Sequence, residues 1–333
     1  MVGIRIFLEI VFIHFIRLLL LPLPLSLVSL PGEALGQALF SVFRLQRRLT
    51  LENLNRAFGD EMDAAVRLKV AAKCYRHFGG VITEFITLAR MSPAQVRSRV
   101  ELENPQVLQA ALDEGKGVLL IGGHMGNWEL MSAAMVAAGI PYTMYVGRQK
   151  NPFADRFINA MRGAYGAGTV AKRGGMRGMI KALRGNQVLG LLSDQHFSRN
   201  RHFVRFFGLP VSVAPGPGAL ATHSRPPLVF AESWKVGRNR YHARFTRLEL
   251  PEPSGNEEWD LLVVSQRISD AVEAAVRRHP EQYFWMHRRW REIPHDRQPT
   301  PVNRRFLEGA SGPGSVPADP GSAEPDDLED LDE

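Results

Sequence analysis

The sequence predicts an α/β fold with a central sheet flanked by helices, and an N-terminal hydrophobic helix that anchors the chain in a membrane. Three observations support this prediction. Residues 4–30 are strongly apolar, residues 51–115 carry apolar side chains at helical spacing, and from residue 118 onward short apolar runs alternate with helical windows. Alternation of this kind is typical of a sheet whose faces are covered by helices.

The apolar segment 4–30 is long enough to cross the core of a bilayer, which takes about 20 apolar residues. Charged residues interrupt it, and Pro22 and Pro24 would break a helix. Because an ionised side chain at mid-bilayer costs about 2.5–3.5 kcal/mol, a shallow or tilted anchor is favoured over a full span. A buried core helix is the third alternative. No small-residue cleavage pattern follows, so a secretory signal peptide is not expected.

Positive charge follows this segment at Arg44, Arg47 and Arg48, which predicts that the body of the chain lies on the cytoplasmic side. We therefore expect a membrane anchor in residues 1–30 and one folded domain in residues 31–308. Residues 309–333 consist mainly of Gly, Pro, Ser, Ala and acidic residues. They hold too few apolar groups to offset the entropy of ordering, so a disordered acidic tail is expected.

The charge of the chain is distributed unevenly. Its 41 basic and 34 acidic residues give a net charge of +7, and eight of the acids lie in the last segment, Asp319–Glu333, which has no basic residue. The rest of the chain therefore carries +15. Such a body attracts an anionic partner, for which nucleic acid, an anionic membrane surface and an acidic carrier protein all qualify. The single cysteine, Cys74, excludes a disulfide framework.

Short apolar runs predict five strands, at residues 118–121, 142–146, 188–192, 228–232 and 241–245. Helical windows lie between and after them, near residues 128–138, 153–165, 176–184 and 259–278.

Residues suited to catalysis gather where the first of these strands ends, in the sequence GGHMGNWE. The strand ends at Gly122–Gly123, His124 follows in a turn, and a helix begins near Trp128 with Asn127 as its N-cap. On one continuous helix His124 and Glu129 would point apart, because five residues turn it by about 500°. With the histidine in the turn, the carboxylate of Glu129 can accept a proton from one imidazole nitrogen and fix the tautomer.

This arrangement predicts general-base chemistry on a hydroxyl. No G-x-S-x-G serine stands nearby, so His124 would itself take the proton of a substrate hydroxyl. An isolated His-x4-Glu pair often arises by chance, and the strand, the two glycines and the helix start around this one give it weight. The sequence has no Walker A loop, G-x-G-x-x-G or HExxH motif.

The segment GHMGNWE resembles the H-x4-D/E motif of the glycerolipid acyltransferase superfamily, and its Asn-Trp-Glu ending resembles the bacterial lipid A late acyltransferases of the lauroyl and myristoyl type. Further segments are similar to that family in order and spacing, namely ENLNRAF, VGRQKNP, LLSDQ, FVRFFG and PEQYFWMHRRWR. The resemblance covers residues 5 to 292. Mycobacterial phosphatidylinositol mannoside acyltransferases share the pattern, so the acceptor is not fixed by it.

The resemblance implies a mixed central sheet and the transfer of a fatty acyl chain from acyl carrier protein or acyl-CoA to a lipid hydroxyl, without metal or cofactor. The expected place is the cytoplasmic face of the bacterial inner membrane. The resemblance makes His124 the base and Glu129 its orienting partner. The polar residues that it places along the substrate pocket are Asn127, Arg148, Arg162, Asp194 and Gln195.

Several of these positions have structural alternatives. Arg148 and Arg162 could stabilise an oxyanion or hold acceptor phosphates, or they could be solvated surface arginines. Asp194 follows a buried-looking strand, where a charge needs a partner, and a salt bridge to one of those arginines is the alternative to a functional role.

The segment QYFWMHRRWR interleaves aromatic residues with arginines. Stacking on nucleic acid is one interpretation, but Tyr, Trp and Arg also suit an anionic membrane interface, so no nucleic acid partner is expected. The favoured acceptor is a lipid A precursor, and another membrane glycolipid or phospholipid is the alternative. A non-catalytic peripheral membrane protein is the remote alternative.

Overall fold

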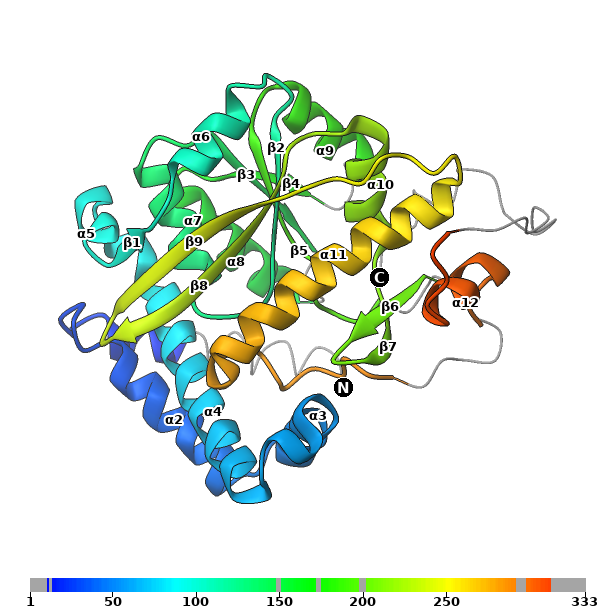
Figure 1. Ribbon diagram of the computed structural model, residues 1–333. Helices are drawn as coiled ribbons and strands as arrows, with labels where there is room; N and C mark the ends of the chain where they lie inside the picture. Colours follow the sequence, from blue (N-terminus) through cyan, green and yellow to red (C-terminus); the bar gives the residue numbers. More distant parts are fainter. Residues whose placement is uncertain are drawn as a thin grey trace.

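The computed structural model describes residue 11 and residues 14–147, 151–171, 175–197, 202–291 and 298–312. Its centre is a seven-stranded sheet in the order β1-β9-β8-β2-β5-β3-β4, with helices on both faces (Figure 1). Neighbouring strands run parallel except for β8 and β9, which form an antiparallel hairpin. The predicted α/β class, with a mixed central sheet flanked by helices, is confirmed.

The strands of this sheet are β1 (Val100–Leu102), β2 (Val118–Gly122), β3 (Tyr142–Val146), β4 (Gly168–Ala171), β5 (Val188–Leu192), β8 (Leu228–Gly237) and β9 (Arg240–Leu248). A separate hairpin consists of β6 (Phe203–Phe206) and β7 (Leu209–Ser212). The helices include α2 (Ser29–Ser41), α3 (Arg47–Phe58), α4 (Ala64–Thr87), α5 (Pro93–Arg97), α6 (Gln106–Leu112), α7 (Trp128–Ala137), α8 (Pro152–Ala164), α9 (Gly175–Arg184), α10 (Pro215–Ser224), α11 (Glu257–Arg278) and α12 (Pro301–Leu307).

All five predicted strands and all four predicted helices are present. The hairpin strands β8 and β9 extend beyond the predicted runs, because their ends are partly exposed and alternate in polarity. The elements that the prediction missed include β1 and β4, which are too short to show a period, and α10, whose PGPG start hides a helix.

Strand β2 lies in the middle of the fold and is buried along its whole length. Val118 and Leu120 pack with α5, α6 and α7 on one face of the sheet. Leu119 and Ile121 pack with α9, α10 and α11 on the other. The loop after β2, which carries His124, is therefore held between two covered faces.

The N-terminal helices form a further layer beside the sheet (Figure 1). Helix α2 packs along α4, and a core that includes residues of α3, α4, α11 and the β6–β7 hairpin joins this layer to the rest. The helices α2 and α4 cross at glycines. A Cβ atom added to Gly79 would lie 2.0 Å from the carbonyl oxygen of Gly32, so only glycine allows this approach.

The predicted membrane anchor lies partly outside the described residues. Residues 14–20 form a helix, and residues 21–28 form irregular turns. This agrees with the helix-breaking effect expected of Pro22 and Pro24. Among the described residues, no helix is both long and apolar enough to cross a membrane. The anchoring role of residues 1–30 stays a prediction, and so does the disordered tail, since residues 313–333 lie outside the described part.

We predict that Gly79→Ala lowers the free energy of unfolding by about 1–3 kcal/mol, because the added methyl group forces α2 away from α4. Urea titration followed by circular dichroism measures the change. The matched control is Gly163→Ala, another helical glycine, whose added Cβ meets no atom within 4 Å. This control should keep or slightly raise stability. Equal stability of the two variants would show that the crossing is not tight.

Candidate active site

His124 and Asp194 meet at the carboxyl edge of the sheet. His124 follows β2 and Asp194 follows the neighbouring parallel strand β5. The Nδ1 atom of His124 lies 2.6 Å from Oδ1 of Asp194, and the backbone N–H of His124 donates to Oδ2 at 2.8 Å. The aspartate side chain is 1% exposed, whereas the imidazole is 19% exposed. The pair thus joins a buried carboxylate to an imidazole that reaches solvent.

The charge state of Asp194 fixes the tautomer of the histidine. Burial by itself would raise the pKa of Asp194, but the charge and hydrogen bonds of His124 outweigh it and hold that pKa well below its usual range. An ionised carboxylate only accepts, so Nδ1 of His124 carries the proton and donates it. The lone pair of a neutral imidazole is then on Nε2, which lies 3.4 Å from the amide nitrogen of Gln195.

The predicted pairing of His124 with Glu129 is corrected by the structure. No hydrogen bond among the described residues joins the two side chains, because Asp194 already occupies Nδ1. The carboxylate of Glu129, which is buried, instead accepts from Nε of Arg162 at 3.1 and 3.2 Å and from its Nη2 at 2.5 Å. Tyr165 adds a hydrogen bond at 3.4 Å.

Glu129, the expected orienting partner of His124, and Arg162, an expected pocket residue, therefore form a largely buried ion pair. Arg162 lies on α8 and Glu129 in the first turn of α7, so the pair ties these helices together. The hydrogen bond and charge of Glu129 raise the pKa of Arg162 even though burial by itself would lower it. The expected contact of Arg162 with substrate stays a prediction. Arg148, the other expected arginine, lies outside the described residues.

The loop that carries His124 is fixed by its backbone. The carbonyl oxygen of His124 accepts from the N–H of Phe284 at 2.9 Å, and the N–H of Gly126 donates to the carbonyl of Gln282 at 2.9 Å. Gly126 has a positive φ of 56°, and a Cβ there would lie 1.9 Å from the carbonyl oxygen of Ser233. Glycine is thus required at this position, both for its backbone conformation and for space.

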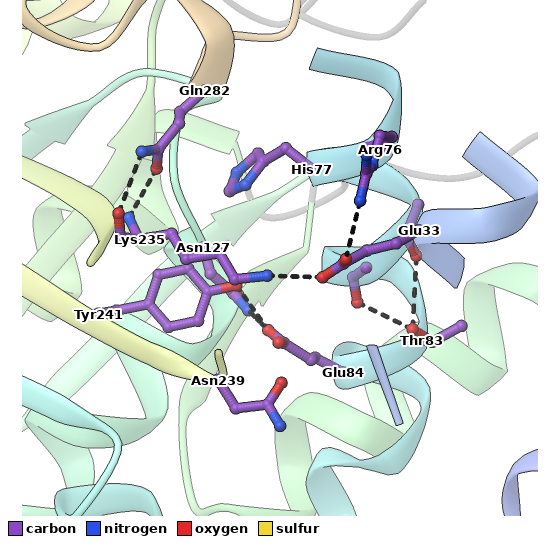
Figure 2. A network of polar contacts seen from close by, with 12 residues as sticks. Glu33, Arg76, His77, Thr83, Glu84, Asn127, Lys235, Asn239, Tyr241 and Gln282 are labelled. Carbon is purple, nitrogen blue, oxygen red and sulfur yellow. Dashed lines mark hydrogen bonds and ion pairs between the residues drawn. The ribbon is translucent and has the colours of Figure 1, made fainter. Parts of the chain in front are cut away.

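A buried polar network holds the other side of the loop, and Figure 2 shows its members. Asn127 caps α7, since its Oδ1 accepts from the N–H of Leu130 at 3.0 Å, which confirms the predicted N-cap. Its amide donates to Glu84 at 2.8 Å, and Tyr241 donates to the same carboxylate oxygen at 2.7 Å. Asn127 is 1% exposed, so the structure gives it a structural role, and its expected contact with substrate stays a prediction.

His77 and Gln282 complete this network (Figure 2). Nε2 of His77 donates to the carbonyl oxygen of Gly126 at 2.9 Å. The side chain of Gln282 pairs with the backbone of Lys235 on β8, at 2.6 and 3.2 Å. Residues of α4, of β8 and of the segment before Tyr283 therefore all converge on the turn at Gly126, which orients the histidine two residues earlier.

Arg289 supports the Asp194 side of the site. Its guanidinium is buried, and Nη1 donates to the carbonyl oxygens of Gln195 and Ser212, both at 3.0 Å. Burial lowers the pKa of Arg289, while the nearby Tyr283 and Asp194 act in the opposite direction. The arginine thus fixes the loop that follows β5.

Sequence reasoning missed the pairing of Asp194 with His124, as well as Glu84, His77 and Gln282, and it placed Arg289 at a membrane interface, whereas the structure buries it. One signal could have found the pairing: LLSDQ ends a strand just as LLIGGH does, and adjacent parallel strands place their carboxyl ends together. The completed site offers an oriented base beside a partly open surface, and this arrangement suits removal of a proton from a hydroxyl.

Comparisons with known proteins give a family match over most of the chain. The model of the family described as bacterial lipid A biosynthesis acyltransferase matches residues 4–292. The phosphatidylinositol mannoside acyltransferase of Mycobacterium tuberculosis (strain CDC 1551 / Oshkosh) is 27% identical over 188 residues, covering 55% of this chain and 57% of that protein. The lipid A biosynthesis myristoyltransferase of Escherichia coli (strain K12) is 23% identical over 253 residues, covering 76% and 77%.

The lipid A biosynthesis acyltransferase of Haemophilus influenzae (strain ATCC 51907 / DSM 11121 / KW20 / Rd) is 24% identical over 203 residues, covering 60% of this chain and 61% of that protein. The chain thus matches less than two thirds of the length of the mycobacterial and Haemophilus relatives.

We predict that Asp194→Asn lowers kcat by about 10²- to 10⁴-fold with little change in KM, because the amide no longer fixes Nδ1 as the protonated nitrogen. Steady-state kinetics of the purified variant measure the loss. The matched control is Glu129→Gln, the same chemical change in the carboxylate that contacts Arg162. A larger loss of kcat from the control, with its fold intact, would contradict the assignment of Asp194.

Acidification should destabilise the protein through His77. Burial lowers the pKa of His77 to about 4, from an ordinary value of 6.5. Between these values the unfolded chain binds the proton and the folded one does not. The contribution of His77 is therefore complete above pH 6.5 and is lost as the pH falls toward 4, by up to about 3 kcal/mol.

Urea titrations at several pH values test this prediction. His77→Gln keeps an amide donor for the carbonyl of Gly126 but cannot titrate, so its free energy of unfolding should fall less between pH 7 and pH 4.5 than that of the wild type. The prediction fails if both proteins lose the same stability over this range.

Proposed function

Since the chain belongs to the bacterial lipid A biosynthesis acyltransferase family, we propose that it transfers a fatty acyl chain from a thioester donor to a hydroxyl group of a lipid acceptor. The favoured acceptor is a lipid A precursor. The names of the relatives, a lipid A biosynthesis myristoyltransferase and a phosphatidylinositol mannoside acyltransferase, support acyl transfer to a glycolipid.

The observation that carries this proposal is the contact of 2.6 Å between Nδ1 of His124 and the buried carboxylate of Asp194. It leaves Nε2 as the basic atom of a ring whose side chain is 19% exposed. It also provides a negative charge that stabilises the imidazolium formed when Nε2 takes a proton. A histidine that only lies on the surface in contact with solvent would not require a buried partner, and the carboxylate of Asp194 is only 1% exposed.

In the proposed reaction, Nε2 of His124 takes the proton of the acceptor hydroxyl while the hydroxyl oxygen attacks the thioester carbonyl. The C–O bond forms, and the carbonyl oxygen carries the negative charge of the tetrahedral intermediate. The C–S bond then breaks, and the thiolate takes the proton back from Nε2. The products are an ester and a free thiol, and the histidine returns to its starting state.

Glu129 acts indirectly in this proposal. Its ion pair with Arg162 fixes α8 against the start of α7, beside the loop of His124. The rings of Trp128 and His124 form a T-shaped contact, with 5.0 Å between the ring centroids. We therefore assign Glu129 to positioning of the site and not to orientation of the imidazole.

We propose acyl carrier protein or acyl-CoA as the donor and the cytoplasmic face of the bacterial inner membrane as the place of reaction. The basic body of the chain supports both, since an acidic carrier and an anionic lipid surface each attract it. A second candidate acceptor is a mannosylated phosphatidylinositol, which the 27% identity to the mycobacterial relative supports.

We predict that the purified full-length protein, given an acyl donor and a lipid A precursor, adds one acyl chain, which mass spectrometry detects as a heavier product. His124→Ala should lower the rate by about 10²- to 10⁴-fold, because the hydroxyl loses its base. A parallel incubation with a phosphatidylinositol mannoside separates the two acceptors. Normal turnover by His124→Ala would overturn the mechanism, and transfer to neither lipid would overturn the proposed function.

A further inference from the structure

The turn between α2 and α3 exposes apolar side chains. Val42 is 72% exposed, Phe43 69% and Leu45 56%, so three large apolar groups within four residues face solvent. Single exposed apolar residues are common on soluble proteins, but a contiguous group of them indicates a contact surface.

Arginines surround this turn. Arg44, Arg47, Arg48 and Arg67 line a groove of about 750 Å³ that runs between α3 and the start of α4. Glu52, which also lines the groove, pairs with Arg48 at 2.6 Å. Four positive charges and one negative charge therefore leave the groove strongly basic.

The turn has a defined conformation. Arg44 and Gln46 have positive φ values of 51° and 52°. The hydroxyl group of Tyr75 donates to the carbonyl oxygen of Leu45, and the guanidinium of Arg47 lies 4.6 Å from the centre of the Phe40 ring. The apolar side chains thus project from a fixed support.

The position of the arginines also favours the binding of an anion. Arg47 and Arg48 occupy the first turn of α3, which has no acidic residue there. The N-terminus of a helix carries partial positive charge, which repels cations. A bound anion would relieve this repulsion, whereas solvent alone leaves it in place.

We propose that the turn Val42–Arg48, together with Arg67, docks on an anionic lipid bilayer. Val42, Phe43 and Leu45 enter the apolar region, and the arginines bind lipid phosphates. This inference rests on the proposed function and deepens it, because it names the surface that meets the membrane holding the acceptor. Helix α2, about 20 Å long, separates this contact from the apolar segment that precedes it.

The apolar side chains distinguish a bilayer from an acidic carrier protein. A basic groove by itself would attract either partner through charge. Burial of three exposed apolar side chains beside the arginines requires an apolar phase directly next to an anionic one, and the headgroup boundary of a bilayer supplies this arrangement.

A fluorescent label on the turn tests the proposal. The one cysteine of the chain, Cys74, is buried, and its burial raises the pKa of the thiol to about 12, so a new surface cysteine can be labelled selectively. Phe43→Cys in the full-length protein is labelled with a polarity-sensitive fluorophore. Vesicles of phosphatidylcholine with phosphatidylglycerol should shift its emission to the blue, and vesicles of phosphatidylcholine alone should do so much less.

Two comparisons make the test specific. Lys116→Cys places the same label on an exposed turn directly before β2, outside the proposed contact, and its emission should not change. Replacement of Arg44, Arg47 and Arg48 by Gln should raise the lipid concentration needed for a half-maximal shift at position 43 by about 100-fold, since each arginine strengthens binding about fivefold.

Three outcomes would overturn the proposal: no shift at position 43, an equal shift at position 116, or a shift produced by acyl carrier protein or inorganic phosphate without vesicles. The assay contains no acyl donor or acceptor, so its failure leaves the proposed function untouched. Acyl transfer measured in detergent solution tests that function separately.

Discussion

The site depends on one contact, the 2.6 Å approach of Asp194 to Nδ1 of His124. A carboxylate that is almost fully buried is costly unless its charge and hydrogen bonds are compensated. The imidazole and the backbone N–H of the same histidine supply that compensation. The carboxylate in return decides which ring nitrogen is free to act as a base. The same contact therefore stabilises the loop and enables the histidine to act as a base.

This contact requires that the turn after β2 keeps one fixed conformation. The N–H and the carbonyl oxygen of Gly126 are bound by residues from two different parts of the chain, Gln282 and His77. The next residue, Asn127, is held by Glu84 (Figure 2). Buried polar groups are costly unless they find partners, and these hydrogen bonds satisfy the backbone of Gly126 and the amide of Asn127. The network thus gives the histidine a single orientation before any substrate arrives.

The outer parts of the molecule fit a reaction at a lipid surface. The ion pair of Glu129 and Arg162 holds α8 beside the site, and α2, packed closely on α4, leads to the exposed basic and apolar turn at Val42–Arg48. A buried pair of this kind contributes little net stability, but loss of one partner leaves an uncompensated charge. Its value here is to position α7 and α8 relative to each other.

The sequence by itself determined the α/β class, five strands and four helices from residue 118 onward, the histidine in its turn and the N-cap at Asn127. These features follow from local periodicity, glycine content and capping chemistry, which neighbouring residues decide. The tertiary structure decided that Asp194, and not Glu129, faces His124, because that contact joins residues 70 positions apart through the order of two parallel strands. It likewise brought Glu84, His77 and Gln282 to the turn after β2. The sequence could not predict this, because no local pattern encodes packing between distant elements.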